Sequence, residues 1–241
     1  MARAKGHTLG PVHLRYRPTP AVDIPTFARA LDLIGIFAFA LSGGWLALRK
    51  QLDLVGVAAL AVAASLFGGL VRDILVGDLP PQLVTDKFYL LIPVVAVLVV
   101  LALPHLSERR FRLVMFFDAV GLGMFAATGA AKAVALGGLG LVSATFVGAV
   151  AAVGGGVIRD ILAAGVPEVF QGDSDLYVVP AVAGAFVASL ATLNGLASLE
   201  VLLACAAGTA VFRLLAVRFG WHTPVPSWVH ERRRRREEDS R

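Results

Sequence analysis

The chain has 241 residues, which in a soluble protein would make one or two domains, and a formal net charge of +5. Hydrophobic residues make up 57% of the chain and charged residues only 16%, whereas soluble domains carry about 25% charged residues. The charges are also confined to the tails and to short connecting segments. The composition therefore excludes a soluble globular domain and predicts an integral membrane protein with several membrane-spanning segments.

The basic residues flank the apolar segments and are not interleaved with aromatic residues, which argues against nucleic acid as a partner. The single cysteine, Cys205, lies in an apolar stretch, so we expect neither an intramolecular disulfide nor a cysteine-based metal site. The five histidines lack metal-ligand spacing, and the sequence contains no phosphate-binding loop or nucleophile elbow. We therefore expect no enzyme, no cofactor and no metal site.

Residues 1–27 are expected to form a polar, basic tail without the features of a cleaved signal peptide. Apolar segments then follow one another, each long enough or nearly so to cross a hydrocarbon layer of about 30 Å as a helix. We predict helices at 29–48, 54–75, 88–104, 112–133, 140–163, 176–193 and 198–217. A charged C-terminal tail at 220–241 completes an all-α membrane protein with seven transmembrane helices.

An odd number of transmembrane helices places the two ends of the chain on opposite sides of the membrane. The side that holds the C-terminus collects most of the arginines outside the N-terminal tail, namely Arg49, those at 109–112, Arg218 and the run at 232–236. Because basic residues accumulate on the cytoplasmic side, we expect a multi-pass protein of the cell membrane with its C-terminus in the cytoplasm and its N-terminus outside.

The sequence contains an internal repeat. FGGLVRDILVGDLP (67–80) matches GGGVIRDILAAGVP (154–167) without a gap, and DLIGIFAFALSG (32–43) matches DAVGLGMFAATG (118–129). Each copy covers three helices, within 28–110 and 111–195, and the last helix, at 196–219, stands outside the repeat. Because three is odd, the second copy must be inverted relative to the first. Inverted repeats are typical of transporters and some channels, with the pathway where the halves meet.

Adjacent glycines recur in the second and fifth helices, as Gly68 and Gly69 and as Gly154, Gly155 and Gly156. Glycine pairs weaken the helical hydrogen-bond ladder, so one interpretation is a kink that lines a permeation path. The alternative is that the glycines only allow two helices to pack closely. Their recurrence at the same place in both copies favours the kink.

An Arg-Asp pair follows the glycines in each copy, and an aspartate opens the helix before it. The residues are Arg72, Asp73 and Asp32 in the first copy and Arg159, Asp160 and Asp118 in the second. Counted from Leu54, Gly68 lies about 21 Å along its helix, which places Arg72 near the membrane interface. We expect each arginine to lie beside the aspartate of its own copy, either as a pore mouth or as a purely structural ion pair.

Lys132 is the one basic residue in an otherwise apolar stretch of the fourth helix. A lone lysine of this kind can extend its ammonium to the membrane surface, which is called snorkelling. The alternative is that Lys132 faces the permeation path and opposes the passage of cations.

The doubled Gly-Gly-x-x-Arg-Asp-Ile-Leu, the segment DLIGIFAFALSG and the TGAAKA around Lys132 resemble the prokaryotic trimeric intracellular cation channel family, also grouped as bacterial glycine-transporter-like proteins. The resemblance covers residues 29–217. It implies a homotrimer in membrane lipid, with a pore for monovalent cations in each protomer that the glycine kinks shape. Animal members bind a phosphoinositide through a Lys-Glu-Val motif, but Lys132 is followed by Ala133 and Val134, so this lipid site does not carry over.

The expected function is a membrane channel for monovalent cations, potassium or sodium. The alternative is a secondary carrier for glycine or another small zwitterion, which needs a site near the membrane midplane for both an amine and a carboxylate. The sequence predicts no charged pair at that depth, which favours the channel. A membrane scaffold without transport is the third hypothesis.

Overall fold

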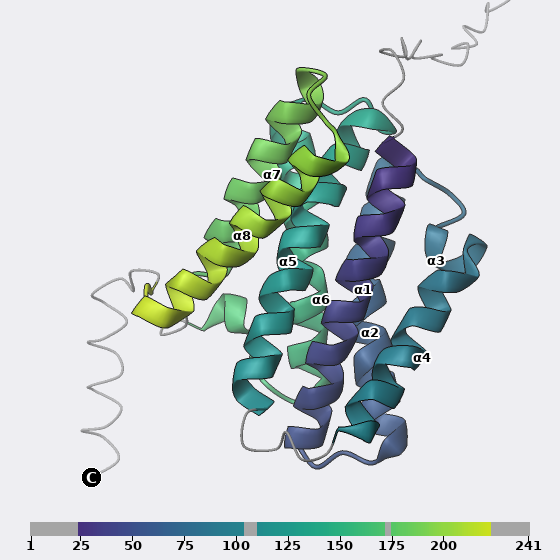
Figure 1. Ribbon diagram of the computed structural model, residues 1–241, viewed down its shortest axis with the longest axis vertical. Helices are drawn as coiled ribbons and strands as arrows, with labels where there is room; N and C mark the ends of the chain where they lie inside the picture. Colours follow the sequence, from purple (N-terminus) through teal and green to yellow (C-terminus); the bar gives the residue numbers. More distant parts are fainter. Residues whose placement is uncertain (1–23, 104–109, 172–174, 223–241) are drawn as a thin grey trace, which may run out of the picture.

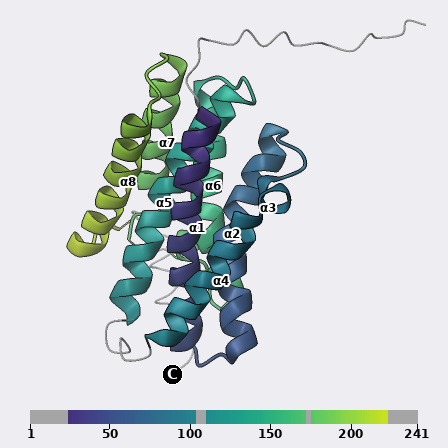
Figure 2. The same ribbon diagram turned by 45° about the vertical axis from the view of Figure 1, so that its right-hand side comes forward.

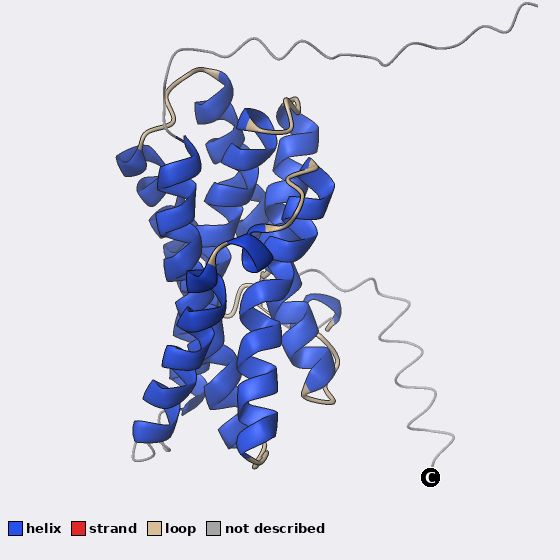
Figure 3. Ribbon diagram, turned by 90° about the vertical axis from the view of Figure 1, so that its right-hand side faces the viewer, coloured by secondary structure: helices blue, strands red, loops and turns tan. Residues whose placement is uncertain are grey.

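The structure, a computed structural model, describes residues 24–103, 110–171 and 175–222. Its helices are α1 (Ile24–Arg49), α2 (Leu54–Val76), α3 (Gln82–Thr85), α4 (Lys87–Ala102), α5 (Arg110–Ala135), α6 (Leu141–Leu162), the 3-10 helix η2 (Glu168–Phe170), α7 (Val178–Leu193) and α8 (Leu199–Phe219). Figure 3 shows them joined by short loops, and the described part has no strand beyond one isolated bridge between Asp175 and His222.

Each of the seven predicted helical segments coincides with a helix of the structure, whereas α3 and η2 were not predicted. Five helices, α1, α2, α5, α6 and α8, are long and apolar enough to cross a membrane. The helices α4 and α7 are also apolar, but they have only 16 residues each. The predicted N-terminal tail at 1–27 is described only from Ile24, where α1 begins, and the predicted C-terminal tail at 220–241 only for its first three residues. The rest of both tails lies outside the described residues.

Local sequence signals set where the helices begin and end. Asp53 caps α2 by accepting a hydrogen bond from the backbone N–H of Gly56 at 2.8 Å, and Asp86 caps α4 by accepting one from Phe88 at 3.0 Å. Such caps satisfy N–H groups that have no partner within the helix. Gly77 ends α2 with φ 78°, a left-handed conformation that glycine adopts without strain.

The helices α1 and α5 cross antiparallel at the centre of the molecule (Figure 1). At this crossing the side chain of Phe39 packs on Gly121 of α5, and that of Phe125 packs on Gly35 of α1. The two buried rings stack with their centroids 5.7 Å apart. A Cβ atom at Gly121 would lie only 2.7 Å from the Phe39 ring, so both glycines make room for the aromatic pair.

The helices α2 and α6 meet in a second reciprocal contact. Gly68 of α2 lies against the carbonyl oxygen of Ala151, and Gly155 of α6 lies against the carbonyl oxygen of Ala64. A Cβ atom at either glycine would overlap that oxygen. Small residues at such crossings allow helices in a membrane to approach closely and to gain van der Waals contact.

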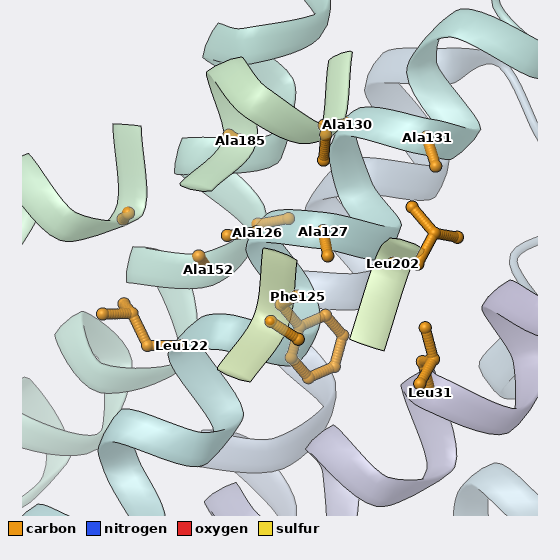
Figure 4. Packing of buried hydrophobic residues seen from close by; sticks show 14 of the residues in the cluster. Leu31, Leu122, Phe125, Ala126, Ala127, Ala130, Ala131, Ala152, Ala185 and Leu202 are labelled. Carbon is orange, nitrogen blue, oxygen red and sulfur yellow. The ribbon is translucent and has the colours of Figure 1, made fainter. Parts of the chain in front are cut away.

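The core between the helices consists largely of alanine around a few large side chains. Figure 4 shows Phe125 and Leu122 of α5 among Ala126, Ala152 and Ala185, all of them buried. The helices α7 and α8 lie side by side and pack on α5 (Figure 2), where Gly123 contacts the backbone of Ala206. The fold thus places α1 and α5 at the centre, where the polar residues Asp32, Ser42, Asp118 and Lys132 are buried.

Candidate functional site

The first buried charge cluster, the Asp32 cluster, consists of Asp32, Arg72, Asp73, Tyr89 and Lys132. Arg72 Nη1 lies 2.7 Å from Asp32 Oδ1, and Arg72 Nη2 lies 2.7 Å from Asp73 Oδ1. The other oxygen of Asp32, Oδ2, accepts hydrogen bonds from the Tyr89 hydroxyl at 3.0 Å and from Lys132 Nζ at 3.1 Å. The four charged side chains are at most 3% exposed.

The second buried charge cluster, the Asp118 cluster, consists of Asp118, Arg159, Asp160, Tyr177 and Ser42. Arg159 Nη1 lies 2.5 Å from Asp118 Oδ1 and donates to Ser42 Oγ at 2.8 Å, and its Nε donates to Asp160 Oδ1 at 2.9 Å. The Tyr177 hydroxyl donates to Asp118 Oδ1 at 3.3 Å. Each cluster therefore holds the arginine, both aspartates and a tyrosine of one sequence copy.

The second aspartate of each pair also anchors the chain after its helix. Asp73 Oδ2 accepts a hydrogen bond from the backbone N–H of Gln82 at 3.0 Å, which begins α3. Asp160 Oδ2 accepts one from Glu168 at 3.0 Å, which begins η2. The two motifs thus produce similar caps over the clusters, nine residues after Asp73 and eight after Asp160, each built from a short helix that the sequence did not predict.

The two clusters differ at one carboxylate oxygen. Among the described residues, Asp118 Oδ2 is buried and has no hydrogen-bond partner. The matching oxygen of Asp32 has two, one of them from Lys132. By the offset that aligns the two aspartates, the residue that corresponds to Lys132 is Leu46 of α1, an apolar and half-buried side chain.

Helix α8 adds a further buried charge beside the Asp118 cluster. Arg213 is 1% exposed, forms an ion pair with Glu168 and donates to the backbone oxygen of Leu176 at 3.1 Å. Its guanidinium lies 4.8 Å from the centroid of the Tyr177 ring. Burial raises the pKa of the Glu168 carboxyl, and the charge of Arg213 opposes that effect. Arg213 lies on α8, outside the repeat, so it has no counterpart in the first copy.

An open cavity of about 330 Å³ adjoins the Asp118 cluster. Its walls include Leu46 and Val114 as well as Arg159, Asp160 and Glu168, and the exposed Arg49 and Lys50 lie at its rim. The cavity beside the Asp32 cluster is much smaller, about 10 Å³, and is lined by Asp73, Gly69 and the ring of Phe125 among others. The two clusters therefore differ in the size of the adjoining cavity as well as in the hydrogen bonds to their first aspartate.

The two clusters are buried inside the helix bundle and lie at different heights along α1. Asp32 and Ser42 contribute to opposite clusters and are ten residues apart on α1, which is about 15 Å along a helix. That spacing is about half of a hydrocarbon layer of about 30 Å. The clusters are shielded from solvent because α3 and η2 cover them and the arginines point back into the helix bundle toward α1 and α5. Their expected position near the membrane interfaces stays a prediction.

The structure bears on two alternatives that the sequence left open, while the predictions that Lys132 faces a permeation path and that the glycines kink their helices stay predictions. Lys132 is 1% exposed and is held by Asp32 from α1, so it is a buried ion-pair partner and does not snorkel. At Gly68 and Gly155, the contacts between α2 and α6 favour close helix packing, the alternative to the kink. Gly69 contacts the Phe125 ring, Gly154 lies beside Gly68, and Gly156 lies against the Tyr177 hydroxyl.

Sequence reasoning missed four residues of the site, for different reasons. Tyr89 and Tyr177 are counterparts in the structure, but the ungapped alignment pairs Tyr89 with Leu176 and hides the match. Arg213 is a lone charge inside an apolar segment, a signal that by itself marks a candidate functional residue. Ser42 carried no signal, because a buried serine in an alanine-rich helix is common in membrane proteins.

The fold and the two clusters define an all-helical, multi-pass membrane protein with ion pairs buried in its interior. Comparison with known proteins agrees. The sequence model of a family described as "Glycine transporter" matches the chain twice, at residues 29–105 and 115–192. The chain belongs to this family, which is the prokaryotic trimeric intracellular cation channel family that its motifs resemble, so that expectation is confirmed.

Individual relatives cover most of the chain. The UPF0126 membrane protein YvgT of Bacillus subtilis is 33% identical over 82% of this chain and 96% of its own length. A UPF0126 membrane protein of Deinococcus radiodurans is 42% identical over 64% of this chain and 72% of its own length. Among solved structures, a prokaryotic TRIC channel in 0.5 M KCl is 31% identical over 81% of this chain and 98% of its own, with a TM-score of 0.74. The TRIC trimeric intracellular cation channel orthologue from Rhodobacter sphaeroides is 30% identical over 81% of this chain and 99% of its own, with a TM-score of 0.74.

Proposed function

We propose that the protein is a channel for monovalent cations such as potassium, with one pathway inside each protomer of a homotrimer. The observation that carries the proposal is the likeness to solved TRIC cation channels along almost their whole length. A further such structure, from work on conductance through TRIC cation channels, matches with 33% identity and a TM-score of 0.72.

The proposal includes the architecture and the orientation predicted from the sequence. Two inverted three-helix units, α1–α4 and α5–α7, would be followed by α8, with the C-terminus in the cytoplasm. The reciprocal contacts between Phe39 and Phe125 and between Gly68 and Gly155 support the inversion, since residues around a two-fold axis contact each other in this mutual way.

The pathway we propose runs from the cavity at the Asp118 cluster, past the crossing of α1 and α5, to the Asp32 cluster. The carboxylates of both clusters would attract cations, as intramembrane charges on ion pathways do. The stacked rings of Phe39 and Phe125 lie between the clusters and are fully buried, so we assign this structure to a closed state. Gly69 and Gly156 border the pathway through their contacts with Phe125 and Tyr177.

One observation favours the second candidate, a carrier for glycine or another small zwitterion. The clusters place carboxylates and cationic groups well inside the bundle, where the sequence predicted no charged pair. Carriers of this kind bind both groups of their substrate near the midplane. The family's description as a glycine transporter points the same way.

Flux measurements on purified protein in liposomes separate the two candidates. We expect electrogenic potassium flux in liposomes and unitary current steps in planar bilayers. The test of the pathway is Arg159→Ala, which removes a positive charge from the cavity wall and should alter the current if cations pass there. Saturable glycine uptake without any conductance would reject the channel and support the carrier.

A further inference from the structure

The charges of the two clusters do not balance in the same way. In the Asp32 cluster, two aspartates face two cations, Arg72 and Lys132, so the formal charge is zero. In the Asp118 cluster, two aspartates face Arg159 alone. The neighbouring pair of Arg213 and Glu168 adds no net charge. Among the described residues, the Asp118 cluster is therefore left with one uncompensated negative charge.

The unpaired charge coincides with an unpaired atom. Asp118 Oδ2 is fully buried and has no hydrogen-bond partner among the described residues, while Oδ1 of the same carboxylate accepts from Arg159 and Tyr177. A buried carboxylate oxygen without a partner is costly, because it has lost its hydration without replacement. The atom that corresponds to it, Asp32 Oδ2, is the one that binds the ammonium of Lys132.

The helix geometry explains why the same position is filled in one cluster only. Asp32 and Leu46 lie on α1, and Asp118 and Lys132 lie on α5, with the same number of residues between the aspartate and the second residue on each helix. In the proposed inverted arrangement, position 46 of α1 corresponds to position 132 of α5, so a long side chain at position 46 would extend toward Asp118 as Lys132 extends toward Asp32. Leu46 instead lines the 330 Å³ cavity, which also reaches Arg159 and Asp160.

We infer that Asp118 Oδ2 and Asp160 form a binding site for one hydrated monovalent alkali cation, at the position that the Lys132 ammonium takes in the Asp32 cluster. The inference deepens the proposed conduction of monovalent cations and rests on it. A single uncompensated charge fits a monovalent ion, whereas a divalent ion such as calcium is normally held by more carboxylates and six to eight oxygens. Arg49 and Lys50 also line this cavity, but both are exposed to solvent, so ions in solution screen their charges. Lys132 acts as a tethered cation, and the matching cation at Asp118 is mobile.

The test exchanges the residue at position 46 and measures the equilibrium binding of radioactive Rb⁺ to purified protein in detergent. Leu46→Lys supplies a tethered ammonium at Asp118, so we expect Rb⁺ binding to weaken at least about tenfold. The matched control, Leu46→Met, changes the side chain's shape without adding charge, and its Rb⁺ affinity should stay close to that of the wild type. Equal binding by the wild type and both variants would overturn the inference, as would a wild-type protein that binds no Rb⁺.

For a second variant, Lys132→Met, we expect more Rb⁺ binding instead of less. It tests the inference even if Leu46→Lys does not fold. Lys132→Met removes the tethered cation from Asp32, so we expect a second Rb⁺ site per chain in addition to that at Asp118. An unchanged number of bound Rb⁺ ions would overturn the inference. Rb⁺ flux into liposomes, measured on the same preparations, separates failure of this binding site from failure of the proposed channel function. Rb⁺ flux in the wild type, together with Rb⁺ binding that Leu46→Lys leaves unchanged, rejects only the site at Asp118. Absence of Rb⁺ flux in the wild type rejects the channel.

Discussion

The Asp32 cluster and the Asp118 cluster share a scaffold and differ in one contact from the facing helix. In both, an arginine bridges two aspartates, a tyrosine hydroxyl reaches the first aspartate and a short helix caps the second. Lys132 completes the first cluster from α5, whereas the corresponding position of α1 holds the apolar Leu46, which lines the cavity beside the second cluster. A duplicated motif can thus keep its ion pairs while a single residue outside it decides whether the cluster is neutral.

The access of each cluster to solvent follows the same difference. The cluster with four paired charges adjoins a cavity of only about 10 Å³, and the cluster with an unpaired oxygen adjoins one of about 330 Å³. The first therefore has the features of a structural ion-pair network, and the second those of a binding site. The predictions below test this distinction.

The largest effect is expected from removing the arginines. Loss of one partner from a buried ion pair costs about 3–5 kcal/mol, because the remaining charge is left uncompensated. Arg72→Ala still leaves Lys132 at 3.1 Å from Asp32, whereas Arg159→Ala leaves Asp118 with only the hydroxyl of Tyr177. We therefore expect Arg159→Ala to lower the free energy of unfolding in detergent by more than Arg72→Ala.

A double-mutant cycle controls this comparison. Asp32→Ala should add little to the loss caused by Arg72→Ala, since residues in direct contact give non-additive changes. The same holds for Asp118→Ala combined with Arg159→Ala. Losses that simply summed, or equal losses for the two arginines, would contradict the assignment of Lys132 as the residue that distinguishes the clusters.

An intermediate and symmetric effect is expected at the crossing of α2 and α6, which both clusters adjoin. Gly68→Ala and Gly155→Ala each place a methyl group against a backbone carbonyl oxygen that cannot move without its helix. Overpacking of this kind costs about 1–3 kcal/mol, and we expect similar losses of unfolding free energy for the two variants. Gly208→Ala on α8 is the matched control, because a Cβ there meets no atom within 4 Å. A loss at one glycine only would break the proposed symmetry.

The smallest effect is expected at the partly exposed ion pair outside the clusters. Arg29 Nε lies 2.5 Å from Asp86 Oδ2, and this hydrogen bond lowers the pKa of the Asp86 carboxyl. A lowered pKa in the folded state stabilises the protein at pH values above the ordinary value of about 3.9, and the stabilisation is lost as the pH falls through the folded-state pKa.

We therefore expect Asp86→Asn to lower the melting temperature at pH 7 slightly, by less than any substitution in the two clusters, because exposed ion pairs contribute little. Thermal melts of both proteins from pH 7 down to about pH 3 check the sign, since the difference should begin to shrink as the pH falls below about 4. A difference that grew on acidification would contradict the assignment.

Much of the fold and part of the site could be predicted from the sequence. The long apolar runs predicted the helices, and the repeated motif predicted that Arg72 lies beside Asp32 and Arg159 beside Asp118, as the structure shows. The lysine partner was not predictable from the repeat, because Lys132 aligns with a leucine and contacts a residue 100 positions away. Contacts that cross from one copy to the other leave no internal match in the sequence.

The burial of the clusters could not be predicted from helix length, for a physical reason. Counting residues along α2 gives the distance of Arg72 from the start of that helix, but the long side chain extends away from its own Cα toward Asp32 of α1. The caps formed by α3 and η2 then exclude solvent from a position that the count alone places near the surface. Helix length therefore predicts where a backbone atom lies, and not where a buried guanidinium ends.

The participation of Arg213 has a consequence for the order in which the protein is assembled during synthesis. Asp32, Arg72 and Tyr89 all belong to the first four helices, so their contacts can form before α5 leaves the ribosome. The Asp118 cluster needs Ser42 from α1 and Tyr177, the residue directly before α7, and the ring of Tyr177 packs against Arg213 in α8. The surroundings of the Asp118 cluster are therefore complete only after residue 213 has been translated. A nascent chain that ends shortly before residue 213 contains all residues of the Asp32 cluster, but its Asp118 cluster lacks the contact between Tyr177 and Arg213.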